Sequence, residues 1–282
     1  MRCLAFTILI SALPLLAGNS KKDPAEIGNR SVASGVNRYS LASEMALGRQ
    51  LAAEVEKQAT MVDDPIVSEY LNRLGQNLAR NSDVTIPVTF RMIESSEINA
   101  FTLPGGYIFV STGLLMMGDN EAELASVISH ELGHAAARHA TRLATRDDMI
   151  SAARVPGTIL LGGWGGLLWD QATKVGSPML ALHFSRDFED EADLLGIQYL
   201  WKAGYDPTAS IDMFERIESI EKSTPGSVSK IFRTHPLTAD RIERTQKNIS
   251  EMLPQQDQYV LNTSEYEDIR TRLGNLIERH KK

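Results

Sequence analysis

The chain has 282 residues, of which 43% are hydrophobic and 23% are charged. These proportions are ordinary for a globular protein and allow one large domain with a normal core. The formal net charge of −7 gives no sign of the basic patch that marks nucleic-acid binding, so no nucleic-acid partner is expected.

The first 18 residues have the layout of a secretory signal peptide. Arg2 is a short basic region, residues 4–16 are apolar, and the small residues Ala17 and Gly18 precede a polar stretch. A buried N-terminal helix or an uncleaved anchor is the alternative. Cys3, the only cysteine, lies inside this segment and too early for a lipidated cleavage site. The sequence therefore predicts export to the periplasm of a mature chain without disulfides.

Three further parts follow the signal peptide. Residues 19–38 are polar and predict a flexible leader. Residues 39–253 contain apolar residues at helical spacing and form the predicted domain. Within it, Asp64 and Pro65 predict the start of a helix, because Asp caps helices and Pro suits their first turn. Residues 254–282 predict a C-terminal helical extension.

Strand patterns lie between the first helices and the centre of the chain. Residues 84–93 alternate with β-branched side chains. Pro104, Gly105 and Gly106 then predict a turn, and residues 107–110 a short strand that forms a hairpin or a sheet edge. Helices are predicted from Asp119 or Asn120 onward, over about 178–203 and over about 237–252. The expected fold is α+β, mostly helical, with a small edge sheet.

Residues 155–169 are apolar and rich in glycine. They predict either a buried loop or kinked helical hairpin, or a mobile lid or patch that contacts a membrane surface or unfolded substrate. The segment is too short and too interrupted by glycine for a good membrane-spanning helix.

An H-E-x-x-H motif is formed by His130, Glu131 and His134. On a helix, residues four apart lie about 40° apart around the axis, so both imidazoles can bind one metal ion. Glu131 is turned by about 100° and can reach a water molecule on that ion as a general base. Apolar and small residues surround the motif, where two histidines and a glutamate would be costly to bury without a partner. A surface helix with two incidental histidines is the alternative.

A catalytic zinc ion usually has three protein ligands and one open position. The extended motif H-E-x-x-H-x-x-G-x-x-H is excluded, because Ala137 and Ala140 replace its glycine and third histidine. His139 follows His134 by five residues and is turned about 140° away from it, so it is predicted not to be a ligand.

Carboxylates for such a site stand between Arg186 and Asp193. Glu189 and Asp193 are four residues apart and share one helix face, whereas Glu191 points to nearly the opposite side. Glu189 is thus a candidate ligand, and Asp193 a candidate acceptor for the free N–H of a ligating imidazole. A solvated acidic helix face explains the same spacing equally well.

Together these motifs resemble a known family. H-E-x-x-H followed by R-x-x-E-x-E-A-D, with the segments 99–110, 203–207 and 234–242, resembles the gluzincin family that includes HtpX and the CAAX prenyl proteases. The resemblance extends over about residues 40–252. Within the family, the chain is most similar to the soluble, periplasmic BepA-like subgroup. That subgroup has helical repeats after its peptidase domain, and none is expected here.

The resemblance implies roles for individual residues. It implies one zinc ion per chain, bound by His130, His134 and Glu189, with Glu131 as the catalytic base. His235 is implied to lie near the zinc, where it either stabilises the oxyanion or ligates zinc in a resting state; packing in a loop is the alternative.

The strand that starts at Gly106 and Tyr107 is implied to bind an extended substrate at its edge, or else merely to complete the sheet.

The function expected from these features is a zinc-dependent endopeptidase that cleaves extended or misfolded polypeptides. The resemblance implies a role in periplasmic quality control, with outer-membrane proteins among the substrates. The apolar composition of residues 155–169 makes that segment the candidate for a peripheral membrane contact. Two other classes remain open: a chaperone-like binder of unfolded clients that cleaves little, and an interaction protein with a structural zinc.

Overall fold

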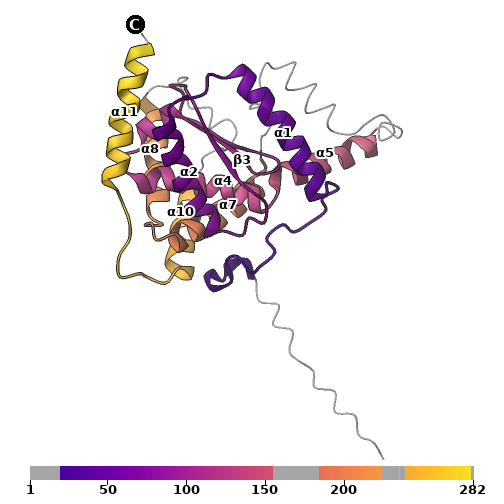
Figure 1. Ribbon diagram of the computed structural model, residues 1–282. Helices are drawn as coiled ribbons and strands as arrows, with labels where there is room; N and C mark the ends of the chain where they lie inside the picture. The colour runs from indigo at the N-terminus through magenta and orange to yellow at the C-terminus, as the bar shows by residue number, and fades with distance from the viewer. Residues whose placement is uncertain (1–19, 155–183, 224–234, 236–238, 281–282) are drawn as a thin grey trace, which may run out of the picture.

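A computed structural model describes residues 20–154, 184–223, 235 and 239–280 (Figure 1). The predicted signal peptide, residues 155–169 and the flanks of His235 lie outside these residues. The elements in chain order are η1 (Ser20–Lys22), η2 (Pro24–Glu26), α1 (Leu41–Gln58), α2 (Pro65–Arg80), β1 (Thr89–Ile93), β2 (Ala100–Leu103), β3 (Tyr107–Ser111), α3 (Thr112–Met117), α4 (Glu121–Ala136), α5 (His139–Arg154), α7 (Arg186–Lys202), α8 (Ala209–Ser223), α10 (Ala239–Met252) and α11 (Ser264–His280).

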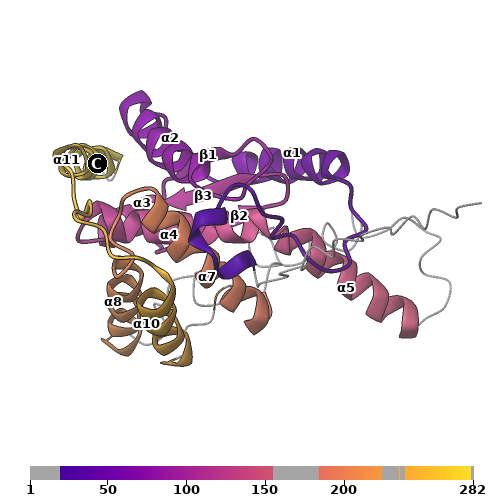
Figure 2. The same cartoon turned by 90° about the horizontal axis from the view of Figure 1, so that it is seen from below.

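The fold is α+β and mostly helical, as the sequence predicts. Its sheet has the strand order β1-β3-β2, with β1 parallel and β2 antiparallel to β3. In the view from below, the sheet lies between α1 and α2 on one side and α4 on the other (Figure 2). β1 is shorter than the predicted strand over 84–93, because Pro87 has no N–H to donate to a ladder.

Helix α4 is the central helix of the domain. Asn120 caps it by accepting a hydrogen bond from the backbone N–H of Glu123, at a start that the sequence predicts. Every residue of α4 is buried except His130. The open side of the central helix is therefore at the first histidine of the H-E-x-x-H motif.

Helices α4 and α7 touch through their backbones at two glycines. A Cβ atom on Gly133 would lie 2.8 Å from the backbone oxygen of Ala192, and one on Gly196 would lie 3.0 Å from the Cα of His130. Larger residues would force the helices apart. This close packing brings the carboxylates of α7 to the imidazoles of α4.

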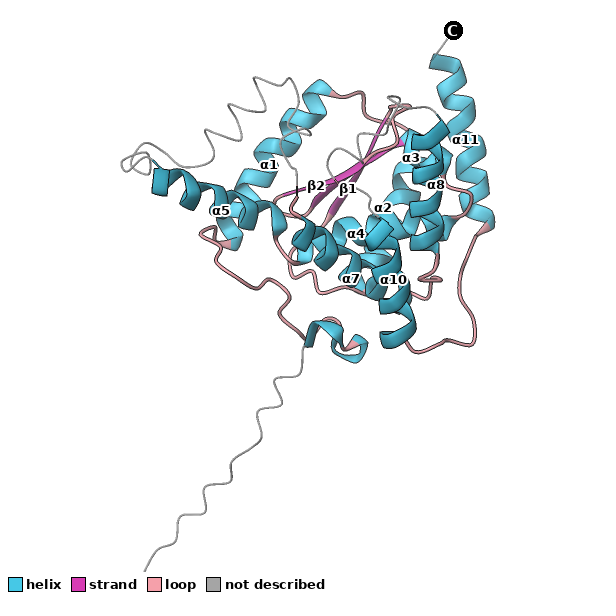
Figure 3. Cartoon of the chain, turned by 180° about the vertical axis from the view of Figure 1, so that it is seen from behind, coloured by secondary structure: helices cyan, strands magenta, loops and turns pink. Residues whose placement is uncertain are grey.

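The ends of the described chain pack onto this core at different places. Ile27, Arg30 and Val32 are buried, so the segment expected to be a flexible leader is held against the domain. α11 packs against α2 and α3, and its Tyr266 and Leu273 are buried. Seen from behind, α5 and α11 lie at opposite ends of the molecule (Figure 3). None of the described helices combines the length and apolarity needed to cross a membrane.

Candidate metal centre

Two imidazoles share one face of α4. The spacing of four residues places the Nε2 atoms of His130 and His134 3.0 Å apart. Both side chains are largely or fully buried. Two ring nitrogens that face each other at this distance favour a shared cation or proton between them.

Glu189 projects from α7 into the same space. Its Oε1 lies 3.4 Å from Nε2 of His134, and its Oε2 lies 3.5 Å from Nε2 of His130. His235, from the chain between α8 and α10, brings its Nδ1 to 2.9 Å from Glu189 Oε1 and 3.3 Å from His130 Nε2. One ligand atom from each of these four residues lies within 4.8 Å of the other three.

This donor set fits a metal ion. Imidazole nitrogens and a carboxylate oxygen are the ligands that zinc takes in proteins. Burial raises the pKa of Glu189, but His235, His130 and His134 outweigh that effect and hold the pKa well below its ordinary value. Burial lowers the pKa of His130, but Asp193 and Glu189 raise it to about 10. The site therefore has the negative potential that attracts a cation.

Glu131 is completely buried beside the four potential ligands. The hydroxyl of Thr102, on strand β2, lies 2.7 Å from its Oε2 and 3.0 Å from its backbone oxygen. The other carboxylate oxygen, Oε1, lies 3.5 Å from Nε2 of His235. The carboxylate is thus held by the sheet on one side and faces the potential metal ligands on the other.

The back of the His130 ring contacts a carboxylate directly. Its Nδ1 lies 2.9 Å from Oδ1 of Asp193. Arg241 of α10 donates to both oxygens of Asp193 at 2.8 Å, and its Nη1 lies 3.0 Å from Oε2 of Glu189. Burial raises the pKa of Asp193, but Arg241 and His130 lower it to about 2. Sequence reasoning missed Arg241, although it stands in the motif segment 234–242.

The back of the His134 ring contacts a second histidine. Nδ1 of His134 lies 2.9 Å from Nδ1 of His139, and Nε2 of His139 lies 2.9 Å from Oε2 of Glu191. His139 is outside the group of potential ligands, as the sequence predicts, but it was given no role there. Burial lowers the pKa of both His134 and His139, which favours neutral rings.

The non-glycine residue Arg138 has a positive φ of 56°, which ends α4 and starts α5 at His139. This break turns His139 back toward His134. Because positive φ is rare outside glycine, nothing in the sequence signals the turn.

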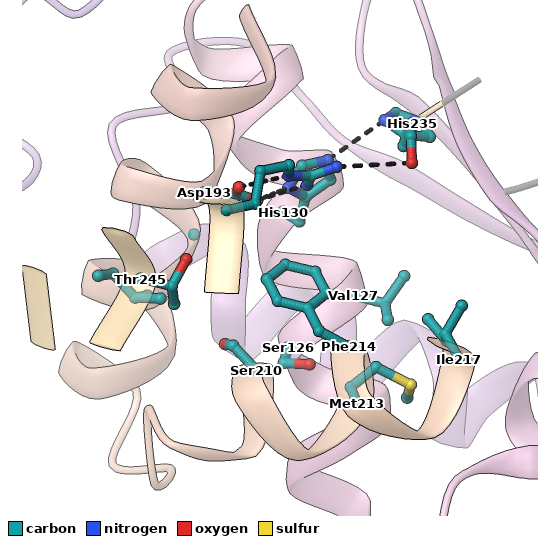
Figure 4. A pocket seen from close by; sticks show the side chains of 13 residues that line it. Ser126, Val127, His130, Asp193, Ser210, Met213, Phe214, Ile217, His235 and Thr245 are labelled. Carbon is teal, nitrogen blue, oxygen red and sulfur yellow. Dashed lines mark hydrogen bonds and ion pairs between the residues drawn. The ribbon is translucent and has the colours of Figure 1, made fainter. Parts of the chain in front are cut away.

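An apolar pocket adjoins the site (Figure 4). His130, His235 and Asp193 lie along one side of it, and helices α4, α7, α8 and α10 form its walls. The apolar side chains that line it are Val127, Ile197, Met213, Phe214 and Ile217.

The predicted substrate strand is not a sheet edge. Tyr107 starts β3, which pairs with β1 on one side and β2 on the other. The prediction that this strand offers an open edge is therefore wrong, because strand order depends on long-range pairing that local sequence does not specify. Gly106 lies in the turn before β3, where its φ is +83° and a Cβ atom would lie 2.5 Å from the backbone oxygen of Pro87. β2 is the edge strand beside the metal centre.

Several known proteases resemble the chain over most of its length. Over 253 residues the chain is 32% identical to the putative beta-barrel assembly-enhancing protease of Vibrio cholerae, covering 87% of this chain and 52% of that protein. Over 231 residues it is 32% identical to the beta-barrel assembly-enhancing protease of Escherichia coli K12, covering 78% of this chain and 47% of that protein. The chain thus spans about half the length of these relatives.

A third relative is matched over nearly its whole length. The chain is 30% identical over 260 residues to the metalloprotease LoiP of Escherichia coli K12, which covers 89% of this chain and 98% of that protein. The pattern that defines peptidase family M48 matches residues 65–249, which include all four potential ligands and Glu131. The family resemblance inferred from the motifs is confirmed: the chain belongs to peptidase family M48 and is a metallopeptidase.

Proposed function

We propose that this protein is a zinc-dependent endopeptidase that cleaves extended or misfolded polypeptides of the bacterial envelope. One observation carries the proposal: the ligand atoms of His130, His134 and Glu189 converge on one point, and the buried carboxylate of Glu131 lies beside them. A structural zinc site would have no use for a buried base next to the metal.

His130, His134 and Glu189 are the proposed ligands. A bound zinc ion would acidify a water molecule to a pKa of about 7 and polarise the carbonyl of a peptide bond. Glu131 is the proposed general base, which takes a proton from the attacking water and passes it to the leaving amide nitrogen. Thr102 holds one oxygen of Glu131 at 2.7 Å, which supports a fixed orientation for this transfer.

The substrate is proposed to bind as an added strand on β2. Among the described strands β2 pairs only with β3, and its Thr102 contacts Glu131. An extended polypeptide that pairs with such an edge presents its backbone to the metal centre. The apolar pocket beside His130 and His235 then suits an apolar side chain next to the cleaved bond.

His235 is proposed to be a fourth ligand in a closed state of the enzyme. Its Nδ1 lies within the cluster of ligand atoms, at 2.9 Å from Glu189 and 3.3 Å from His130. If this is right, His235→Ala should raise turnover. Lost turnover would instead support oxyanion stabilisation by His235, and unchanged turnover would remove both roles.

The proposed location is the periplasm, and unfolded outer-membrane proteins are the proposed natural substrates. The signal-peptide pattern of residues 1–18 supports export. Two relatives whose names describe a beta-barrel assembly-enhancing protease support the substrate class.

Metal analysis and degradation assays test the proposal together. The purified protein should contain about one zinc per chain and degrade casein and a urea-unfolded outer-membrane β-barrel protein. Glu131→Gln should keep its zinc and lose about 10²- to 10⁴-fold in kcat, the usual contribution of a general base.

Two neighbours on α7 provide a matched pair of variants. Glu189→Ala should lose both zinc and activity. Asp190→Ala should keep both, because Asp190 contacts the partly exposed Arg244 instead of the metal centre. Degradation that persists unchanged in Glu131→Gln would refute the mechanism. If wild type and Glu131→Gln protected an unfolded client protein from aggregation equally well, a chaperone function would be favoured.

A further inference from the structure

The ring of His134 is supported by a chain of contacts that reaches the N-terminal segment. From Nδ1 of His134 the contacts run to Nδ1 of His139 at 2.9 Å, and from Nε2 of His139 to Oε2 of Glu191 at 2.9 Å. Arg142 donates to the same oxygen of Glu191 at 2.9 Å, and Lys21 forms an ion pair with the other oxygen. None of these supporting residues belongs to the group of potential ligands.

Only one arrangement of protons satisfies the contacts from His134 through His139 to Glu191. If His134 offers the lone pair of Nε2 to a metal, its Nδ1 carries the proton and donates. Nδ1 of His139 must then accept, so the proton of His139 sits on Nε2 and is donated to Glu191. An anionic Glu191 can accept but cannot donate. The tautomer of the metal ligand is thus coupled to a carboxylate through a neutral imidazole.

Packing holds these side chains in place. His139 is completely buried, and its ring stacks on Phe188 with centroids 4.3 Å apart. The ring of His134 stacks on Phe184 with centroids 4.1 Å apart. The guanidinium of Arg142 lies 4.6 Å above the centre of the Phe188 ring. The rings therefore have little freedom to turn away from each other.

Lys21 is fixed by its backbone as well as by its side chain. Its carbonyl oxygen accepts hydrogen bonds from Gln198 at 3.0 Å and from Arg30 at 2.8 Å. Arg30 in turn pairs with the buried Asp83 at 2.9 Å. The N-terminal segment is thus anchored to α7, the helix that carries Glu189 and Glu191.

We propose that His139 and Glu191 are positioning residues for the metal ligand His134, and that Lys21 makes the N-terminal segment part of this support. The inference rests on the proposed role of His134 as a ligand. Partners behind a metal-bound imidazole fix its orientation and raise its basicity, and their loss typically costs about 10- to 100-fold in metal affinity. The N-terminal segment, far from the motif in sequence, thereby contributes to metal affinity.

Zinc affinity of the metal-free protein, measured by competition with a chromophoric chelator, tests this inference without any turnover assay. His139→Leu should bind zinc about 10- to 100-fold more weakly than the wild type at an equal degree of folding. Lys21→Met should show a smaller, several-fold loss. Lys22→Met is the matched control, because Lys22 is exposed and lies next to Lys21. An affinity of His139→Leu within twofold of wild type overturns the inference, and equal affinities of Lys21→Met and Lys22→Met overturn the part played by the segment.

Ring ¹⁵N shifts of the zinc-loaded wild type give a second test that needs no buried substitution. His139 should carry its proton on Nε2 and leave Nδ1 bare, and the opposite tautomer overturns the inference. The results distinguish a failure of this inference from a failure of the proposed function. A wild type that binds no zinc refutes that function, whereas tight zinc binding that is indifferent to His139 refutes only the support described here.

Discussion

The two histidines of the H-E-x-x-H motif sit one helical turn apart, yet their surroundings behind the rings differ. His130 contacts a carboxylate directly, and that carboxylate is paired with a buried arginine: the side chains of Asp193 and Arg241 are 7% and 5% exposed. His134 contacts a carboxylate only through a second imidazole, and the far end of that chain is more open, with Glu191 and Lys21 15% and 20% exposed.

This difference indicates which of the contacts behind the two rings should be most costly to remove. A charge pair inside a protein is screened little, and removing one partner leaves the other buried without compensation. A pair that water can reach is screened and replaceable. The support of His130 should therefore be strong and intolerant of change, whereas the support of His134 should be weaker and adjustable from the protein surface.

The largest expected effect comes from removing the direct carboxylate. Asp193→Ala removes the bidentate partner of the buried Arg241, which keeps its ion pair with Glu189, and should cost about 3 kcal/mol of folding stability, the low end for a broken buried pair. Glu191→Ala leaves its cations partly exposed and should cost clearly less. Urea denaturation of the two metal-free variants measures the difference. Equal losses would show that the two supports do not differ as their burial suggests.

The second effect is a difference in stabilisation by zinc. At free zinc 100 times the dissociation constant, binding should stabilise the wild type by about 2.7 kcal/mol, and this gain disappears on chelation. A tenfold loss of affinity should reduce the gain to about 1.4 kcal/mol at the same zinc concentration, and a hundredfold loss to about 0.4 kcal/mol. Thermal unfolding with zinc and with chelator should therefore give a smaller zinc-dependent shift for Glu191→Ala than for wild type, and a smaller one still for Asp193→Ala. The reverse order of the two variants would contradict the comparison.

The third effect concerns the proposed general base, Glu131, and should not change metal binding. Thr102→Val removes the hydroxyl that contacts Glu131 but keeps the side-chain shape. A hydrogen bond to a charged group contributes about 1.5–3 kcal/mol, so kcat should fall about tenfold or more while KM and zinc affinity stay unchanged. Thr102→Ser keeps a hydroxyl and should retain most of the activity. A loss of zinc by Thr102→Val would show that the strand supports the ligands as well as the base.

The sequence predicts one part of this site well and another part poorly, for a physical reason. Spacings of four residues on single helices predict that His130 pairs with His134 and Glu189 with Asp193, because helix geometry is local. Glu191 points to the other side of α7, as its spacing predicts. Its partner His139 lies on that side only because the helix ends at Arg138, which has a positive φ. No glycine in the sequence indicates this change of direction.

The strand order and the contact between Thr102 and Glu131 were not predicted, for a related reason. The sequence predicts the turn between β2 and β3 from its proline and glycines, with a hairpin as one of two alternatives, but the order of strands is set by the pairing of β1 with β3. The edge beside Glu131 therefore belongs to β2 and to Thr102. The prediction of a mostly helical α+β fold needed only hydrophobic periodicity and helix caps, and it is confirmed.

The smallest effect is expected at a counterpart of the Arg241–Asp193 pair in which the arginine is exposed and the side chain of Asp64 is only 9% exposed. Arg272 of α11 donates to Asp64 at 2.9 and 2.7 Å, but its side chain is 42% exposed. The hydrogen bonds from Arg272 lower the pKa of Asp64 below its ordinary value of 3.8. A lowered folded-state pKa stabilises the fold above the unfolded value, and this contribution is lost as the pH falls through the folded value.

Arg272→Leu should therefore destabilise the protein slightly between pH 5 and about pH 7, and less and less below about pH 4. Urea denaturation of wild type and variant at several pH values measures this difference. Because solvent screens the Arg272 pair, its loss should cost much less than that of the Arg241–Asp193 pair, which has the same bidentate geometry. If the Arg272–Asp64 pair proved as costly to break as the Arg241–Asp193 pair, burial of the arginine would no longer explain why the two candidate ligand histidines should respond differently to mutation.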